Sequence, residues 1–87
     1  MRIYKYVLKA KDEQVIKIKG LAKVLSVAEQ DNNIVLYAQV DDNPHEYALA
    51  VDIVGTGHEY AFQKEFLGTV KLHDGAIMFH IFYSTRY

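Results

Sequence analysis

The sequence contains no cysteine, and this absence removes several classes of protein. A chain without cysteine forms no disulfide framework, binds no zinc through thiolates and has no cysteine nucleophile. It also lacks a long apolar run, so we expect neither a signal peptide nor a membrane-spanning segment. The expectation is a cytoplasmic protein.

An excess of charge of either sign is also missing. Ten Lys and Arg residues stand against 11 Asp and Glu residues, and the formal net charge is −1. A protein that binds nucleic acid without sequence preference carries a basic excess, and a DNA mimic carries an acidic one, so the charge balance argues against both. With 87 residues, of which 51% are hydrophobic, the composition fits one ordered β-rich domain over residues 1–87.

Turn-forming residues are spread evenly along the chain, and the short segments between them are rich in Val, Ile, Tyr and Phe. This spacing predicts a mostly β protein, a small antiparallel β-sandwich or barrel of about 6–7 strands. The predicted strands are Arg2–Lys9, Val15–Lys19, Ala22–Gln30, Ile34–Asp41, Tyr47–Val54, Phe66–His73 and Ala76–Tyr83.

Asp74-Gly75 predicts a two-residue type I′ turn, because such a turn needs positive φ at both positions. This turn pairs Leu72 with Ile77, Val70 with Phe79, and Gly68 with Ile81. These six residues then share one apolar face, which Phe66 continues, and the other face is mixed, as in a half-buried antiparallel pair.

Asn32-Asn33 predicts a second hairpin, since asparagine tolerates the left-handed conformation. The resulting pairs are Asp31 with Ile34, Glu29 with Leu36, Val27 with Ala38, and Leu25 with Val40. One row of side chains is then expected in the core: Ile34, Leu36, Ala38 and Val40, completed by Leu25 and Val27.

The secondary structure of two segments stays open. Val15–Lys19 alternates as a strand with Ile16 and Ile18 inward, but an amphipathic helix continuing to Leu25 also fits, although Gly20 weakens it by about 1 kcal/mol relative to Ala. Thr56 and Glu59 have the spacing of a capping box, which allows one short helix near residues 57–64.

Val54-Gly55-Thr56-Gly57-His58 is the segment most like a binding site. Two glycines around a hydroxyl residue permit close backbone approach, and the N–H groups at a helix start attract anions. The segment lacks the lysine and the spacing of a phosphate loop. Glycines that leave a strand commonly form a plain turn, so a ligand site and a turn both stay open.

Metal and catalytic sites are not predicted. His73 and His80 share a face of the last predicted hairpin but are not cross-strand partners, and His45 lies in a polar loop. Neither Ser26 nor Ser84 belongs to a nucleophile motif. We therefore assign no cofactor, no metal and no catalytic residue, and treat enzymatic activity as the lesser hypothesis.

The seven tyrosines and four phenylalanines place apolar rings on both sheet faces. Tyr37, Tyr47 and Tyr83 fall partly on the second faces, where a ring stacks on a base or packs on another chain. For a chain of this size, this pattern favours a homo-oligomer.

Several segments together resemble a family of small uncharacterised proteins of tailed bacteriophages and prophages. They are Ile3–Tyr6, Asp12–Gln14, Leu25–Val27, Leu36–Ala38, Val54–His58, Gly68–Val70 and Gly75–Phe82. The resemblance departs at Asp42–Glu46 and in the tail Ser84–Tyr87. It implies a phage accessory protein in the cytoplasm of a bacterial host and supplies no catalytic residues.

The leading hypothesis is a non-enzymatic oligomer that acts by binding, in counter-defence. It would sequester a small nucleotide-like ligand or block a host protein. The candidate ligand-binding residues are Gly55, Thr56, Gly57, His58, Tyr37, Tyr60 and His80, placed at a subunit interface. Thr56 would donate to a phosphate that also attracts His58, and Tyr37 or Tyr60 would stack on the base.

Two alternatives stay open. One is a protein-interaction module without a small ligand, which would recruit its partner through an exposed strand edge. The other is a small metal- or histidine-dependent enzyme built on His58, His73 and His80.

Overall fold

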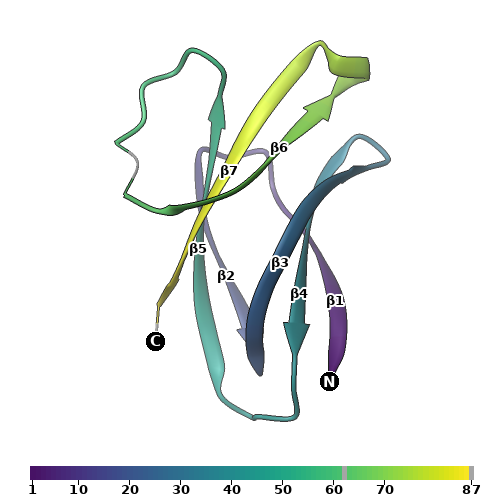
Figure 1. The fold of residues 1–87 in the computed structure, drawn as a ribbon, viewed down its shortest axis with the longest axis vertical. Coiled ribbons are helices and arrows are strands. Elements are labelled where there is room, and N and C mark those ends of the chain that lie inside the picture. The colour runs from purple at the N-terminus through teal and green to yellow at the C-terminus, as the bar shows by residue number, and fades with distance from the viewer. Residues whose placement is uncertain (62, 87) are drawn as a thin grey trace.

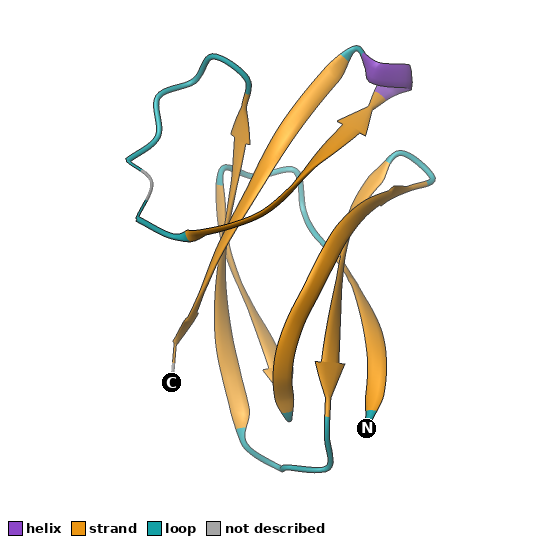
Figure 2. Cartoon of the chain, viewed as in Figure 1, coloured by secondary structure: helices purple, strands orange, loops and turns teal. Residues whose placement is uncertain are grey.

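The computed structural model describes residues 1–61 and 63–86, which form seven strands, one 3₁₀ turn and no α-helix (Figures 1 and 2). The elements are β1 (Arg2–Val7), β2 (Glu13–Lys19), β3 (Leu21–Gln30), β4 (Asn33–Val40), β5 (Glu46–Gly55), β6 (Glu65–Leu72), η1 (His73–Gly75) and β7 (Ile77–Arg86). All strand pairs are antiparallel.

The strands form two sheets. One sheet has the order β1-β4-β3 and the other the order β2-β5-β7-β6. The sheets pack face to face, with β3 against β6. The predicted fold class, a small antiparallel β-sandwich, is confirmed.

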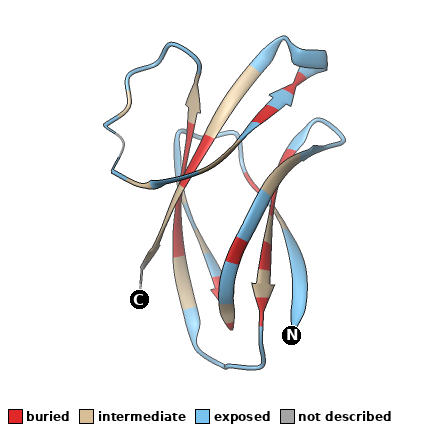
Figure 3. Cartoon of the chain, viewed as in Figure 1, coloured by how far each residue is buried: buried red, intermediate tan, exposed pale blue. Residues whose placement is uncertain are grey.

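The core lies between the two sheets, and every strand except β1 carries buried residues toward it, whereas β1 has no buried residue (Figure 3). The predicted row of Ile34, Leu36, Ala38 and Val40 is buried, and it meets side chains of the other sheet such as Ile18, Leu49, Val51 and Ile81. Each large side chain buried there stabilises the fold by about 1.5–3 kcal/mol. The alternation of strand residues thus decides which face of each sheet is inside.

Gly20 forms the corner between β2 and β3, with φ at +71°. A Cβ atom at this position would collide with the carbonyl oxygen of Asp41. The Gly20 amide donates to the carbonyl oxygen of His45 at 2.8 Å, and the Gly20 carbonyl accepts from the amide of Asp41 at 2.9 Å. The strand interpretation of Val15–Lys19 is confirmed and the amphipathic helix is wrong, because glycine ends one strand here and starts the next.

The hairpin at Asp74-Gly75 has the predicted pairing and positive φ at both predicted positions, but the turn is longer than two residues, because His73 also has positive φ and the strands end at Leu72 and Ile77. Asp74 and Gly75 have φ values of 56° and 88°, and the amide of Ala76 donates to the carbonyl oxygen of His73 at 3.0 Å. Leu72 pairs with Ile77, Val70 with Phe79, and Gly68 with Ile81.

Phe66 is a correction to that hairpin. The pairing of β6 with β7 shifts between Phe66 and Gly68, so that Phe66 lies opposite Phe82. A bulge of this kind moves the preceding residue to the other face of the sheet. Phe66 therefore lies on the outer face and is 55% exposed, instead of continuing the apolar inner row.

The turn of the β3–β4 hairpin is one position earlier than predicted. Asp31 and Asn32 have positive φ, and Gln30 pairs with Asn33. The Asn32 amide donates to Oε2 of Glu29 at 2.5 Å, and its side chain contacts His73, so the neighbouring hairpin selects Asn32 for the turn. Further along, β3 has pairing shifts on either side of Lys23 and Val24, and Leu25 is exposed where Val24 is buried. The predicted burial of Leu25 is therefore wrong.

The helix allowed near residues 57–64 does not form in the described part of that segment. A capping box needs the Thr56 hydroxyl to accept from a backbone amide three residues on. In the structure, this hydroxyl is instead 2.8 Å from the ring of His80. The helix interpretation was wrong because a tertiary contact competes for the capping group.

Candidate functional site

The connection from β5 to β6 lies against the outer face of the four-stranded sheet. Cross-strand pairing puts Asp52 beside Phe82 and Val54 beside His80 on that face. Asp52 and Phe82 are nevertheless buried, at 6% exposure each. Residues on an outer face are buried only when something covers them, and here Tyr60 of the connection packs on Phe82 with ring centroids 4.5 Å apart.

The connection is fastened by a buried carboxylate. Oδ2 of Asp52 accepts from the hydroxyl of Tyr60 at 2.7 Å and from Nζ of Lys64 at 2.8 Å. Burial and this hydrogen bond raise the pKa of Tyr60 to about 12, because both disfavour the phenolate. Asp52 thus has its charge paired within the fold.

The Gly55–His58 segment is a tight turn. The amide of His58 donates to the carbonyl oxygen of Gly55 at 3.1 Å, and Gly57 has φ at +88°, as glycine has in the third position of a type II turn. The ring of His58 folds back onto Gly55, where a Cβ atom would lie 3.0 Å from its Cε1. The backbone of the turn therefore requires glycine at position 57, whereas at Gly55 a Cβ atom would meet only the side chain of His58.

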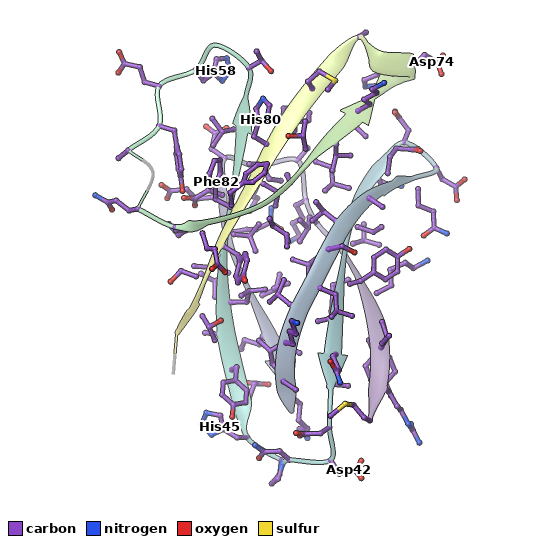
Figure 4. All side chains as sticks on the ribbon, viewed as in Figure 1. Asp42, His45, His58, Asp74, His80 and Phe82 are labelled. Carbon is purple, nitrogen blue, oxygen red and sulfur yellow. The ribbon has the colours of Figure 1, made fainter. Side chains whose placement is uncertain are left out.

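Turn, connection and sheet face enclose a cavity of about 440 Å³. Its lining residues are Val54, Gly55, Thr56, Gly57, His58, Tyr60, Phe66, His80 and Phe82. Figure 4 shows His58 on the connection, with His80 and Phe82 along the neighbouring strand. A volume of this size is within the range of small-molecule sites.

Six of the seven predicted site residues line this cavity: Gly55, Thr56, Gly57, His58, Tyr60 and His80. Tyr37 does not. It lies in the middle of β4, in the other sheet, where it pairs with Lys5 and Ser26. Of the two tyrosines expected to stack on a base, only Tyr60 is near the turn.

His80 is held by two hydroxyl groups. Its Nε2 atom is 2.8 Å from Oγ1 of Thr56, and its Nδ1 atom is 2.9 Å from Oγ1 of Thr69. Thr56 lines the cavity, and Thr69 is the cross-strand partner of His80. The ring is therefore fixed in orientation and forms the polar end of an otherwise apolar cavity.

Apolar and aromatic groups make most of the rest of the wall. Phe66 packs on Phe82 with centroids 5.3 Å apart and ring planes at 59°. Among the residues that the structure describes, no Lys, Arg, Asp or Glu lines this cavity. An adjoining cavity of about 230 Å³ shares Val54, His58 and Tyr60 with this one, and its other lining residues include the acidic Asp12, Glu13, Asp52 and Glu59. These surroundings favour an uncharged ligand over a phosphate.

The sequence interpretation missed Asp52, Phe66, Thr69 and Phe82. Asp52 gave a usable signal, because it is the one charged residue in the apolar run from Tyr47 to Val54. Thr69 was detectable as the residue opposite His80 in the predicted hairpin. Phe66 gave no such signal, because the bulge that turns it outward is not visible in the alternation.

The other histidines lie elsewhere. His73 is in the β6–β7 turn, and the ring of His45 contacts the ring of Tyr47 at 4.4 Å. Among the described residues, no group of three or more His, Asp or Glu side chains is arranged to hold a metal ion.

Fold and site together define a small all-β domain with a cavity on the outer face of one sheet. The chain belongs to the DUF7352 family, a domain of unknown function, and the match spans residues 1–87. A search of curated proteins and a search of solved structures each found no match. In the residues that the structure describes, no helix has the length and apolar character needed to cross a membrane.

Proposed function

We propose that this protein acts by binding a small, planar, uncharged ligand in the cavity between the Gly55–His58 turn and the outer face of the four-stranded sheet. The observation that carries the proposal is the convergence of three aromatic rings and one oriented histidine on a single cavity of about 440 Å³. Tyr60 and Phe66 offer apolar surface to a ring, Phe82 supports both from behind, and the pair of His80 and Thr56 offers a hydrogen bond at one end.

The ligand class follows from the charges. A nucleotide-like ligand would place its base in this cavity, because stacking on aromatic rings tolerates any planar base. Its phosphates would find no Lys or Arg among the described lining residues, only the histidines His58 and His80, and would approach the acidic adjoining cavity. We therefore propose a nucleobase, a nucleoside or a ring compound of similar size in preference to a nucleoside polyphosphate.

The biological setting belongs to the same proposal. The resemblance to proteins of tailed phages supports action in the cytoplasm of a bacterial host. There, a protein that sequesters a small signalling molecule would act as a counter-defence factor without catalysing a reaction.

Native mass spectrometry of untagged protein, followed by titration with adenosine and with AMP, tests this function. The proposal is supported by a ligand mass that stays bound to the protein, or by saturable binding of adenosine with an affinity at least equal to that of AMP. Phe66→Ala should weaken binding, because Phe66 lines the cavity. The control is Val15→Ala, which removes an equally exposed apolar side chain, 56% against 55%, outside the cavity. The proposal fails if no ring compound binds, or if both variants bind as the unmodified protein does.

The edge strand β1 favours a second candidate function, self-association. In the part of the chain that the structure describes, β1 pairs only with β4, and Met1, Ile3, Tyr4 and Val7 are exposed large apolar side chains on or next to it. The charge of Lys5 is directed away from this edge, because its Nζ donates to Oε1 of Gln30 at 2.8 Å. Gln30 is on β3, at the opposite edge of the sheet. An edge strand that exposes several apolar side chains favours pairing with another strand.

The partner that this edge fits is a second copy of the same strand. In an antiparallel pair with Tyr4 opposite Tyr4, Ile3 lies opposite the Lys5 of the second copy, and Arg2 lies opposite its Tyr6. No like charges then face each other. Light scattering should detect a dimer that Ile3→Lys dissociates and that Val15→Lys, on the edge strand β2, leaves intact. A monomer at all concentrations would contradict this candidate.

A further inference from the structure

We propose that the hydroxyl of Thr69 leaves both tautomers of His80 accessible, and that the tautomer decides whether Thr56 offers the ligand a hydrogen-bond donor or an acceptor. This inference rests on the proposed function, since it concerns the ligand of the same cavity. It makes Thr69 a specificity-determining residue although Thr69 is not among the residues that line the cavity.

The geometry places three polar groups in a chain. Thr69 Oγ1 contacts His80 Nδ1 at 2.9 Å, and His80 Nε2 contacts Thr56 Oγ1 at 2.8 Å. Both distances are those of well-formed hydrogen bonds. Because a neutral imidazole has one N–H and one bare nitrogen, the two threonines must take opposite roles toward it.

Each tautomer gives Thr56 a different character. When Nε2 carries the proton, it donates to Thr56, and the hydroxyl proton of Thr56 is left to donate into the cavity. When Nδ1 carries the proton, it donates to Thr69, and Thr56 must give its own proton to Nε2. Thr56 then presents only a lone pair to the ligand.

The ligand and the tautomer are therefore linked. A ligand with an acceptor atom stabilises the Nε2–H form, and a ligand with a donor group stabilises the Nδ1–H form. Since the same chemical group, a threonine hydroxyl, partners each nitrogen, neither form is excluded by its neighbours. The unmodified site thus accepts ring compounds whose polar edge is of either kind.

Replacing Thr69 should remove this symmetry. In Thr69→Val, an Nδ1–H would lose its acceptor, whereas a bare Nδ1 would lose only a donor. Water at this exposed position can replace part of the lost hydrogen bond, and the remaining difference favours the bare Nδ1, because proteins tolerate an unpaired acceptor better than an unpaired N–H. The variant should therefore hold His80 as Nε2–H and leave Thr56 as a donor, which selects ligands with an acceptor atom.

Two probes with one polar atom each test the inference. Indole carries only a donor N–H and quinoline only an acceptor nitrogen. The affinity ratio of quinoline to indole, measured by NMR titration, should rise about fivefold in Thr69→Val, the ratio expected for one hydrogen bond. Thr69→Ser keeps the hydroxyl and should restore the original ratio. The nitrogen chemical shifts of His80 should report the change of tautomer without any ligand.

The outcomes separate this inference from the function on which it rests. If both probes bind and Thr69→Val changes neither their ratio nor the nitrogen shifts, the tautomer control is wrong and the binding site stands. If neither probe binds to the unmodified protein, the inference and the proposed site fail together. If Thr69→Val unfolds the chain, the quinoline-to-indole affinity ratio and the nitrogen shifts of His80 are measured in Thr69→Ser and Thr56→Val instead. The inference then requires that Thr56→Val lose the preference for ligands with a polar edge.

Discussion

The hydroxyl of Tyr60 and the carboxylate of Asp52 are 2.7 Å apart, and this contact fastens the β5–β6 connection to the sheet. Asp52 comes from the middle of β5 and is buried, whereas Tyr60 comes from a connection whose described residues form no helix or strand. Lys64 completes the arrangement at 2.8 Å from the same oxygen. This contact holds one wall of the cavity in place, because Tyr60 is a lining residue.

Tyr60→Phe should destabilise the protein by about 1.5–3 kcal/mol, the range for a hydrogen bond to a charged group. The ring and its packing on Phe82 are kept, so the loss reports the hydrogen bond. Urea denaturation measures the change, and faster amide exchange in residues 57–61 would locate it. Tyr4→Phe is the control, since its hydroxyl accepts only an exposed bond from Arg2 at 3.2 Å, and it should change stability by less than about 0.5 kcal/mol.

Stability should fall between about pH 10 and pH 12 because of Tyr60. Its pKa in the folded protein is about 12, against an ordinary value of 10.0. In this window the unfolded chain releases the phenol proton while the folded chain retains it, so unfolding becomes more favourable as the pH rises. Below pH 10 the full contribution is present.

The same window contains other tyrosines, so the Tyr60 effect is measured as a difference. Burial raises the pKa of Tyr6, and a hydrogen bond to Glu65 raises the pKa of Tyr83. Both remain in Tyr60→Phe. Denaturation curves of the unmodified protein and of Tyr60→Phe should therefore converge as the pH approaches 12, and curves that stay parallel would contradict the assignment.

Local turn chemistry explains which parts of the fold the sequence could predict. The position of the Asp74-Gly75 turn was predictable, because two residues suited to positive φ stand together, whereas the positive φ of His73 that lengthens the turn was not. At Asp31-Asn32-Asn33 three suitable residues are adjacent, and the choice among them depends on the contact between Asn32 and His73, 41 positions away. Information of that range is not in the local pattern.

The site shows the same limit. The Gly55–His58 turn and its neighbour Tyr60 were found from residue type alone, because glycines and a histidine at a strand end are visible in the sequence. The wall formed by Phe66 depends on a bulge in β6, and the missing helix depends on the competition of His80 for Thr56. Each of these outcomes is decided by a tertiary contact that overrides a local preference.

Gly68→Ala should destabilise the sandwich by about 1–3 kcal/mol through overpacking. A Cβ atom on Gly68 would lie 3.1 Å from Cγ2 of Val27, at the point where β6 packs on β3. In a Val27→Ala background this contact is absent, so the same substitution should cost less than about 1 kcal/mol. The difference between the two costs is the coupling energy of the two residues, about 0.5–3 kcal/mol for residues in contact. Thermal or urea unfolding of the four proteins measures the cycle, and an unchanged cost in both backgrounds would show that Val27 is not the obstacle.

Asn32 should stabilise the fold in two separable ways, through its backbone conformation and through its side chain. Its φ is 63°, its Oδ1 accepts from the amide of His73 at 2.9 Å, and its Nδ2 lies 3.2 Å from Nδ1 of that ring. These contacts join the tips of the β3–β4 and β6–β7 hairpins, which lie on the same side of the molecule in Figure 1.

Asn32→Gly keeps the backbone conformation and loses the contacts, so we expect the free energy of unfolding to fall by about 1 kcal/mol. Asn32→Ala loses both and should cost about 1–2 kcal/mol more, because a Cβ disfavours positive φ without the local hydrogen bonds of asparagine. Equal stabilities of the glycine variant and the unmodified protein in urea denaturation would mean that the contact between the two hairpin tips contributes nothing to folding.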